Sequence, residues 1–382
     1  MKILFFAPYF YPYVSGMTTY PLAVFSELAR KHQVTALSFA HVTGLKQREV
    51  HAGMVIERMS YFTRISKGFL SPQSLRIFIQ KIKEADVVVV NLPSVEGLPL
   101  VLLAKLLRKP VVALFYCEVV LSQSLFERLA AWVLNTLTRI QLQFCTSIVA
   151  LSYDYVDSLG WTEKMRQKVL IVPPPITELE TDIAFEKHLK KLKGNTHMIG
   201  FAGRVSREKG LAVLAAALPL IRAKKPVQFI CAGPYGEQVA GESEYFSQLK
   251  CAFAEQSIQH TFLGSLSGGK LGAFYRTIDL LVLPSINKTE AMGMVQLEAL
   301  LVGTPVVASN LPGVRQPVLQ TGMGEIAAVA DATDLAEKIS VVLSRPKSYG
   351  TQTQKTQVKK LFGSNSTARI IEQILQDAVS VS

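Results

Sequence analysis

Short runs of β-branched and apolar residues alternate with amphipathic stretches along the chain, and this alternation is the strongest constraint on its fold. The pattern predicts parallel strands that are covered by helices on both faces of a sheet. The strands expected in the first half are 2–7, 34–39, 87–91, 111–115, 148–151 and 169–172. The pattern then restarts, with strands expected at 198–202, 228–232, 260–262, 280–283 and 305–308. The sequence therefore predicts an α/β protein with two doubly wound parallel sheets.

The chain has 382 residues, which is too long for one ordinary core and favours two domains. Three consecutive prolines at 173–175 resist helix formation, and a charged stretch follows them. The expected order is a first domain over 1–175, a linker over 176–196, a second domain over 197–365 and a final helix over 366–382. The inward-facing residues expected on that last helix are Ile370, Ile371, Ile374 and Leu375.

The charge of the chain is strongly basic, at +12, and residues 1–175 hold 19 Lys and Arg against 11 Asp and Glu. This excess favours an anionic partner, either a membrane surface or a phosphorylated acceptor, but it also fits ordinary solubility charge. The basic residues are scattered and show none of the spacings of nucleic-acid-binding motifs, so we expect no nucleic-acid partner.

The distribution of cysteines and apolar runs bears on the compartment. The four cysteines lie far apart without a C-x-x-C pair, which indicates a reducing compartment and supports no structural zinc. The N-terminus lacks the pattern of a signal peptide, and polar residues interrupt the longest apolar runs. We expect a cytoplasmic protein, with the inner face of the membrane as an alternative location. Basic and aromatic residues interleave over 61–70, a segment that could rest on a membrane or a lipid-linked acceptor, or be a plain loop.

The densest group of candidate binding residues surrounds Gly293, which lies between an apolar strand and a helix-forming run that begins at Met294. A helix that begins there points unpaired N–H groups and a positive dipole end into the preceding loop, where Glu290 lies. Since Gly293 has no Cβ, an anion can approach the backbone closely. Glu298, more than one turn into the helix, is an acceptor suited to a pair of ribose hydroxyls. The arrangement fits a nucleotide diphosphate.

Glu290 and Glu298, with seven residues between them, resemble the E-x7-E element of retaining GT-B glycosyltransferases of the glycogen synthase/glycosyltransferase-4 type, also described as glycosyl transferases group 1. Upstream, the run from Gly203 to Gly210 is similar to the family's strand–loop element, in which an Arg and a Lys neutralise the donor diphosphate. The resemblance is densest over 198–330. Further matching elements are Gly233-Pro-Tyr-Gly-Glu237, Phe262-Leu-Gly264, Leu283-Pro-Ser285 and Gly303-Thr-Pro305.

The resemblance implies a GT-B fold, in which two Rossmann-like domains face each other across a cleft. It implies a metal-independent hexosyltransferase that moves a sugar from a nucleotide-diphosphate sugar to a hydroxyl of a glycan, lipid-linked or small-molecule acceptor, as in polysaccharide or glycolipid synthesis. No cofactor and no metal site are expected. The implied nucleotide-sugar-binding residues are Gly16, Gly203, Arg204, Lys209, Gly233, Gly264, Glu290, Ala291, Gly293, Met294, Val295 and Glu298.

The implied catalytic residues are Glu290, Arg204, Lys209, Glu118 and Tyr116. In many relatives the strand that corresponds to 111–115 ends in a His, whereas this chain has Tyr116 there and Glu118 two residues later. Glu118 could hold an acceptor or sugar hydroxyl, and Tyr116 could donate a hydrogen bond. The missing His leaves open a catalytically impaired GT-B protein that binds a nucleotide sugar as a subunit or regulator. A dinucleotide-dependent enzyme is disfavoured, because no G-x-G-x-x-G follows the first strand.

Overall fold

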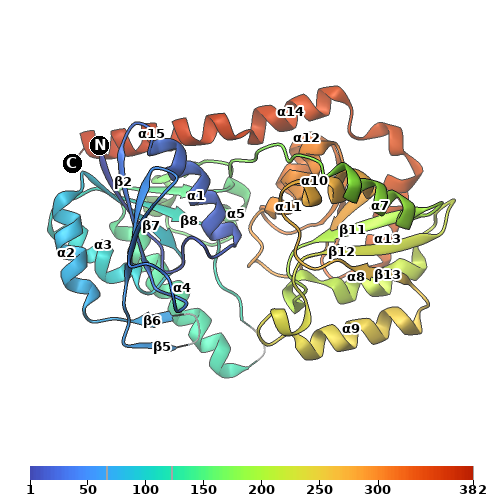
Figure 1. Ribbon diagram of the computed structural model, residues 1–382, viewed down its shortest axis with the longest axis horizontal. Helices are drawn as coiled ribbons and strands as arrows, with labels where there is room; N and C mark the ends of the chain where they lie inside the picture. Colours follow the sequence, from blue (N-terminus) through green and yellow to red (C-terminus); the bar gives the residue numbers. More distant parts are fainter. Residues whose placement is uncertain (66–67, 122–123, 382) are drawn as a thin grey trace. The chain divides into compact units, whose positions relative to one another are not determined.

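The computed structural model describes residues 1–65, 68–121 and 124–381, and the chain divides into two compact units (Figure 1). Unit 1 comprises Met1–Pro175 and Ser364–Ser382, and unit 2 comprises Ile176–Gly363. The segment 176–196, expected as a linker, is instead part of unit 2. Its helix α7 (Ile183–Lys193) packs against α10 (Gly268–Thr277). Leu189 of α7 is fully buried, and the Asp182 N–H donates to the Gly269 carbonyl oxygen at 2.9 Å.

Unit 1 is built on an eight-stranded sheet in the order β10-β9-β8-β7-β1-β2-β4-β3, in which only β3 and β4 pair antiparallel. The strands are β1 (Lys2–Phe6), β2 (Gln33–Phe39), β3 (Arg48–His51), β4 (Met54–Met59), β7 (Val87–Leu92), β8 (Val111–Phe115), β9 (Ser147–Ala150) and β10 (Val169–Ile171). Every residue of β7 is buried, as expected for a central parallel strand with both faces covered.

The helices of unit 1 are α1 (Gly16–Leu28), α2 (Ser74–Glu84), α3 (Gly97–Leu106), α4 (Leu125–Phe144), α5 (Tyr153–Asp157), α6 (Glu163–Arg166) and α15 (Ser364–Ser380). Helix α3 packs between α2 and α4, whereas α15 packs against α1 and against β7 and β8. The C-terminal helix therefore completes the unit that contains the N-terminus (Figure 1). Ile371, Ile374 and Leu375 are buried as expected, but Ile370 was placed wrongly, since it is 41% exposed.

Unit 2 contains a six-stranded, wholly parallel sheet in the order β13-β12-β11-β14-β15-β16. Its strands are β11 (His197–Ala202), β12 (Val227–Ala232), β13 (Gln259–Phe262), β14 (Leu280–Leu283), β15 (Val306–Ser309) and β16 (Gly324–Ala327). Its remaining helices are α8 (Leu211–Ala217), α9 (Ser243–Glu255), α11 (Met294–Val302), α12 (Gln316–Thr321), α13 (Ala332–Ser344) and α14 (Gln352–Phe362). The predicted α/β class with two parallel sheets is confirmed.

The segment 61–70 forms a short antiparallel hairpin of β5 (Thr63–Ile65) and β6 (Gly68–Leu70). Its Phe69 is buried against Tyr9, Phe39 and Tyr61, so this ring belongs to the core of unit 1. Phe62 and Leu70 are exposed. Lys67, which contributed to the expected basic character, lies outside the described residues.

Candidate functional site

The candidate site of unit 2 lies where the strand order of its sheet reverses. Strands β11, β12 and β13 follow one another in one direction from β11, whereas β14, β15 and β16 follow one another on its other side. Ligands of doubly wound sheets bind outside the carboxyl ends of the strands at such a switch point. The loop after β11 carries Arg204 and Lys209, and the loop after β14 carries Glu290. These neighbouring strands therefore bring two sequence-distant parts of the predicted site to one edge.

Hydrogen bonding joins these two loops directly. The Ile286 N–H donates to the Glu208 carbonyl oxygen at 2.9 Å, and Lys209 Nζ forms an ion pair with Glu290 Oε2. The two charged side chains are only 20% and 15% exposed, respectively. The pair is therefore a mostly enclosed cation and anion at the edge where the sequence predicts a diphosphate and a sugar.

Arg204 lies at the more open side of the same loop, with 51% of its side chain exposed. Its guanidinium is 3.3 Å from Glu208 Oε1, which also accepts a hydrogen bond from Ser206 Oγ at 2.6 Å. This i,i+4 ion pair is exposed and contributes little to stability. Arg204 can therefore exchange Glu208 for an anionic ligand at small cost.

Three of the predicted glycines line the same edge through their backbones. The Gly203 N–H donates to the Ala232 carbonyl oxygen at 2.9 Å, and the Gly233 N–H donates to that of Gly264 at 2.8 Å. Gly233 has a φ of +149°, and a Cβ on it would lie 1.9 Å from the Gly203 carbonyl oxygen. Only glycine fits this close crossing of the loops after β11 and β12.

Helix α11 begins at Met294 with Gly293 as its N-cap residue and ends before Gly303, as the sequence predicts. Gly293 has a φ of +76°, and a Cβ on it would lie 2.3 Å from Leu283 Cδ2. Met294 and Val295 form the first turn and are half-buried, while Ala291 is buried in the preceding loop. The first N–H groups of a helix have no intrahelical partner, so this end of α11 can receive an anion.

Glu298 lies more than one turn into α11 and accepts a hydrogen bond from the Tyr275 hydroxyl at 2.7 Å. Burial raises the pKa of the Glu298 carboxyl above its ordinary value, and the Tyr275 hydrogen bond partly opposes that shift. Tyr275, for which no role in the site was expected, is itself fully buried on α10. Nothing in the spacing of the two residues along the chain indicates this contact.

The remaining predicted residues belong to unit 1. Gly16 is the exposed first residue of α1, which follows β1. Tyr116 follows β8 and is 7% exposed, with its ring at 5.7 Å from that of Tyr20 in an edge-on arrangement. Its buried hydroxyl has no hydrogen-bond partner within the described parts of the chain, and burial raises its pKa well above the usual value. Tyr116 is therefore a core residue in unit 1, and its expected role as a donor to a ligand stays a prediction.

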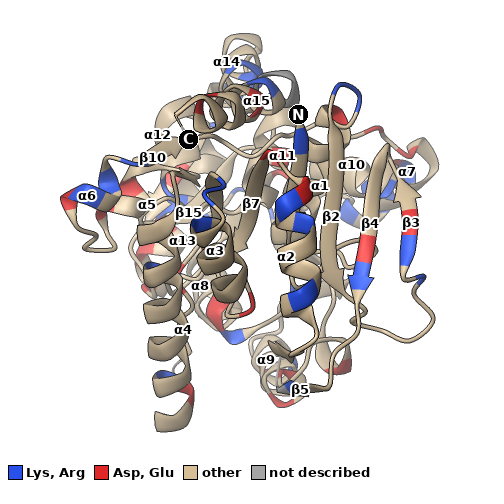
Figure 2. Cartoon of the chain, turned by 90° about the vertical axis from the view of Figure 1, so that its left-hand side faces the viewer, with Lys and Arg blue, Asp and Glu red and all other residues tan. Residues whose placement is uncertain are grey.

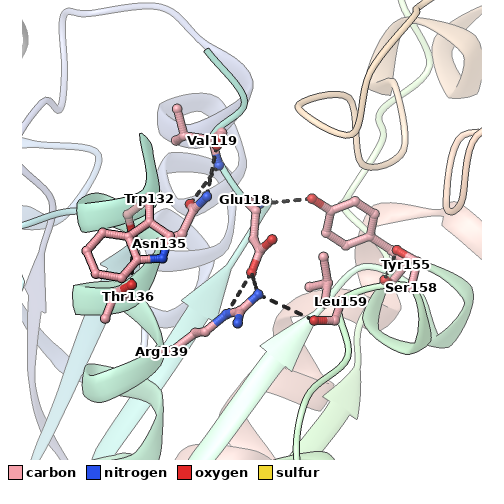
Figure 3. Close-up of polar contacts among 9 residues, drawn as sticks. All are labelled: Glu118, Val119, Trp132, Asn135, Thr136, Arg139, Tyr155, Ser158 and Leu159. Carbon is pink, nitrogen blue, oxygen red and sulfur yellow. Dashed lines mark hydrogen bonds and ion pairs between the residues drawn. The ribbon is translucent and has the colours of Figure 1, made fainter. Parts of the chain in front are cut away.

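Glu118 lies between α4 and α5 and binds Arg139 of α4 (Figure 3). Glu118 Oε1 accepts hydrogen bonds from Arg139 Nε at 3.0 Å and Nη2 at 2.7 Å. The Glu118 N–H donates to the Tyr155 hydroxyl at 2.9 Å. One carboxylate oxygen is thus committed to Arg139, so Glu118 also has a structural role that the sequence did not indicate.

No group of three or more His, Cys, Asp or Glu side chains that could hold a metal ion is found in the part of the chain that the structure describes. Within the same residues, no helix is both long and apolar enough to cross a membrane.

Residues 182–358 match the family model described as glycosyl transferases group 1. This stretch is a glycosyl transferases group 1 domain. It contains Arg204, Lys209, Glu290, Gly293 and Glu298, and the resemblance noted in the sequence is confirmed there.

Two curated relatives illustrate the similarity. D-inositol 3-phosphate glycosyltransferase of Pseudarthrobacter chlorophenolicus is 30% identical over 182 residues, which are 47% of this chain and 43% of that protein. 2-Deoxystreptamine glucosyltransferase of Streptomyces kanamyceticus is 25% identical over 256 residues, which are 64% of each protein. The chain thus spans less than two thirds of the length of these relatives.

Solved structures resemble the chain over its whole length. Anabaena HepE in complex with UDP and glucose has a TM-score of 0.76 at 20% identity and covers 99% of this chain and 100% of its own. Sucrose-phosphate synthase from Thermosynechococcus elongatus has a TM-score of 0.80 at 17% identity and covers 100% of both chains. At such identities the likeness shows the fold, and the expected GT-B class is confirmed.

Proposed function

We propose that the protein is a retaining, metal-independent glycosyltransferase that moves a sugar from a nucleotide-diphosphate sugar to a hydroxyl acceptor. The observation that carries this proposal is the joint placement of Lys209, Glu290 and the start of α11 at the switch point of the unit 2 sheet. Arg204 lies in the same loop as Lys209, and Glu298 follows on α11. A cation pair, a helix N-terminus and two carboxylates suit a diphosphate with a sugar on each side.

Each part of the donor has a partner in this arrangement. The diphosphate would bind the Arg204 and Lys209 side chains and the first N–H groups of α11. The ribose hydroxyls would donate to the Glu298 carboxylate, which Tyr275 holds in place. Glu290, in the loop before the helix, would accept hydrogen bonds from the transferred sugar.

The same residues account for the chemistry. The bond between the sugar C1 and the diphosphate oxygen breaks, the acceptor oxygen bonds to C1, and the acceptor proton passes to the leaving phosphate oxygen. Negative charge develops on the diphosphate as it leaves, so Arg204, Lys209 and the α11 dipole stabilise the transition state more than the ground state. In metal-dependent glycosyltransferases a bound metal ion supplies this positive charge. Because Arg204, Lys209 and the α11 dipole would supply it here, we propose that transfer is metal-independent.

The ion pair between Lys209 and Glu290 gives the unliganded site a stable resting arrangement. Without Glu290, the Lys209 ammonium would be a mostly enclosed charge with no anion in contact, a costly state. When a donor arrives, its diphosphate would share Lys209, and Glu290 would be released toward the sugar.

The donor class to test first is a UDP-sugar, because HepE has been crystallised with UDP and with UDP-glucose. The acceptor would be a glycan, a lipid-linked sugar or a small molecule. The basic excess of unit 1 supports a cytoplasmic location with peripheral contact at the inner membrane face.

A panel of UDP-, GDP-, ADP- and dTDP-sugars tests the proposal by thermal shift, since a ligand that binds only the folded protein raises its Tm with concentration. Release of the nucleoside diphosphate from the stabilising donor is then measured with and without acceptors. A donor that stabilises the protein and is turned over supports the proposal. If no nucleotide sugar stabilises the chain, the proposal is wrong.

The alternative is a GT-B protein that binds a nucleotide sugar without transferring it. The buried Tyr116 hydroxyl favours it, because Tyr116 stands where many relatives have a His near the reacting carbon. This alternative would be supported if a donor stabilises the protein but no nucleoside diphosphate is released, even on long incubation with candidate acceptors.

A further inference from the structure

The first half of α4 carries large apolar side chains that no other part of unit 1 covers. Leu125, Phe126, Leu129, Trp132 and Val133 are 82%, 80%, 58%, 65% and 41% exposed. Their spacing along the chain is that of one helical face, which in most helices is buried against a core. An exposed apolar face of this kind indicates an interaction surface.

The second half of α4 is fixed to the body of unit 1. The side chain of Asn135 both accepts from the Val119 N–H and donates to its carbonyl oxygen, each at 2.9 Å (Figure 3). Arg139 binds Glu118, and Gln141 Nε2 donates to the Ser94 carbonyl oxygen at 2.7 Å. The exposed face is therefore presented by a rigidly held helix, and rotation of α4 could not bury it without breaking these contacts.

The first turns of α4 project beyond the end of α3. In Figure 2 the lower part of α4 stands free, while α3 lies beside its upper part and α2 lies on the far side of α3. Residues 124–126 and 128–130 are all exposed, so solvent surrounds this end of the helix on several sides. A convex apolar projection of this kind suits a fluid surface that can close around it.

The three helices α2, α3 and α4 together carry more positive than negative charge. Their acidic residues are Glu84 and Glu127, and their basic residues are Arg76, Lys81, Lys83, Lys105, Arg128 and Arg139. Arg76 and Arg128 lie in the first turns of α2 and α4, whereas Lys81, Lys83 and Lys105 lie in the last turns of α2 and α3, and Lys81 and Arg139 are paired with Glu57 and Glu118. Basic residues near an apolar helix face are attracted to anionic headgroups, each contributing about 1 kcal/mol close to the surface.

We propose that α4 docks unit 1 on an anionic lipid surface, with Leu125, Phe126, Leu129 and Trp132 entering the headgroup region. Interfacial helices bury an apolar face of this kind to a depth of roughly 5–10 Å. Trp132 suits that position, because its ring is apolar and its N–H remains near polar groups. This docking does not require the segment 61–70, for which the sequence left a membrane contact and a plain loop open, and Phe69 of that segment belongs to the core. The inference is independent of the transfer reaction, because docking requires no donor.

Vesicle sedimentation tests the proposal with the full chain. Vesicles of phosphatidylcholine mixed with phosphatidylglycerol should carry the protein into the pellet, and added salt should release part of it. Vesicles of phosphatidylcholine alone should bind markedly less. Equal binding to both compositions would contradict the role of the basic residues.

The decisive variant combines Leu125→Ser, Phe126→Ser and Leu129→Ser, and its vesicle partitioning should fall about tenfold or more. Its matched control is Ile183→Ser, Leu220→Ser and Leu319→Ser, since these unit 2 residues are 66%, 51% and 60% exposed. The control should sediment like the parent protein. Both variants should keep the parent Tm and the donor-induced thermal shift, which separates this test from that of the glycosyltransferase proposal.

Tryptophan fluorescence gives a second readout. The chain has two tryptophans, and Trp161 is only 7% exposed, so a blue shift on addition of anionic vesicles should come from Trp132. Trp132→Phe should remove that shift while most of the protein still sediments. The proposal is overturned if the parent protein does not sediment with anionic vesicles, or if the triple Ser variant sediments equally well. It is also overturned if light scattering shows that the substitutions convert a dimer to a monomer, because the face would then join two copies of the chain.

Discussion

The Tyr275 hydroxyl donates a hydrogen bond to Glu298 Oε2 at 2.7 Å, which ties the carboxylate proposed to bind ribose to a fully buried side chain of α10. The bond fixes the direction of Glu298 and leaves its other oxygen for a ligand. It also favours the ionised carboxyl, against the burial that raises its pKa.

Replacement of Tyr275 by Phe should weaken nucleotide binding most at low pH. Without the hydrogen bond the pKa of Glu298 rises further, so the carboxylate needed by the ribose hydroxyls is lost at a higher pH than in the parent protein. Calorimetry of the nucleoside diphosphate across a pH series measures this displacement. Tyr349→Phe is the control, because it removes a similar hydrogen bond, to Glu325 at 3.1 Å. A pH profile that is identical in the parent and in Tyr275→Phe would exclude Glu298 as the titrating ribose acceptor.

Glu298 should also make the free energy of unfolding depend on pH. Because the pKa of Glu298 is higher in the folded than in the unfolded protein, the folded state holds its proton more tightly. The contribution of Glu298 to the free energy of unfolding should therefore fall as pH rises from the unfolded pKa through the folded pKa. Glu298→Gln should flatten this part of the pH–stability curve, as urea denaturation would show.

Removal of either predicted diphosphate cation should slow transfer while the fold survives. Arg204→Ala and Lys209→Ala should each lose roughly 2–4 kcal/mol of transition-state stabilisation, seen as lower kcat/KM. Arg222→Ala is the control, because it removes an exposed positive charge that precedes β12, at the other end of the sheet. If both site variants kept the parent kinetics, neither side chain would face the donor.

Removal of metal ions should leave transfer intact. EDTA treatment followed by assay tests this, because Arg204, Lys209 and the start of α11 are proposed to supply the positive charge that the diphosphate needs. Activity that disappears with EDTA and returns with Mg²⁺ or Mn²⁺ would place the protein in a different mechanistic class.

Much of the fold could be predicted because the central strands are continuous apolar runs with clear breaks. Strands β3, β4 and β16 were missed, as were the three-residue hairpin strands β5 and β6. Arg48–His51 is a polar edge strand, and the charged Glu57 and Arg58 interrupt the apolar run of Met54–Met59. Gly324–Ala327 is short and begins with glycine. Leu75 and Ile79 share a helical face with Phe78 and Ile82, yet they are 44% and 37% exposed. The spacing of these four residues indicates an apolar face of α2 but not how much of that face the sheet covers.

The candidate site shows the same limit. Glycines and charged residues at fixed spacing, such as Glu290 and Gly293, could be recognised because backbone geometry and charge act locally. The contacts of Glu298 with Tyr275 and of Glu118 with Arg139 could not be recognised, since they depend on how separate elements pack. The exposure of the apolar face of α4 could not be predicted either, because the spacing of apolar residues is the same in a buried and in an exposed helical face.

Glu290 and Glu298 belong to one motif, but their replacement by Ala should affect nucleotide binding and turnover differently. Glu298→Ala should weaken the donor and the free nucleoside diphosphate alike, by about 1.5–3 kcal/mol, because ribose is present in both ligands. Glu290→Ala should lower kcat for the sugar donor and bind the free nucleoside diphosphate at least as tightly, because that ligand has no sugar and Lys209 then has no competing carboxylate. Calorimetry with the nucleoside diphosphate on both variants, beside steady-state kinetics with the donor, measures the difference. Loss of nucleotide binding in Glu290→Ala with retention in Glu298→Ala would mean that the two roles are reversed.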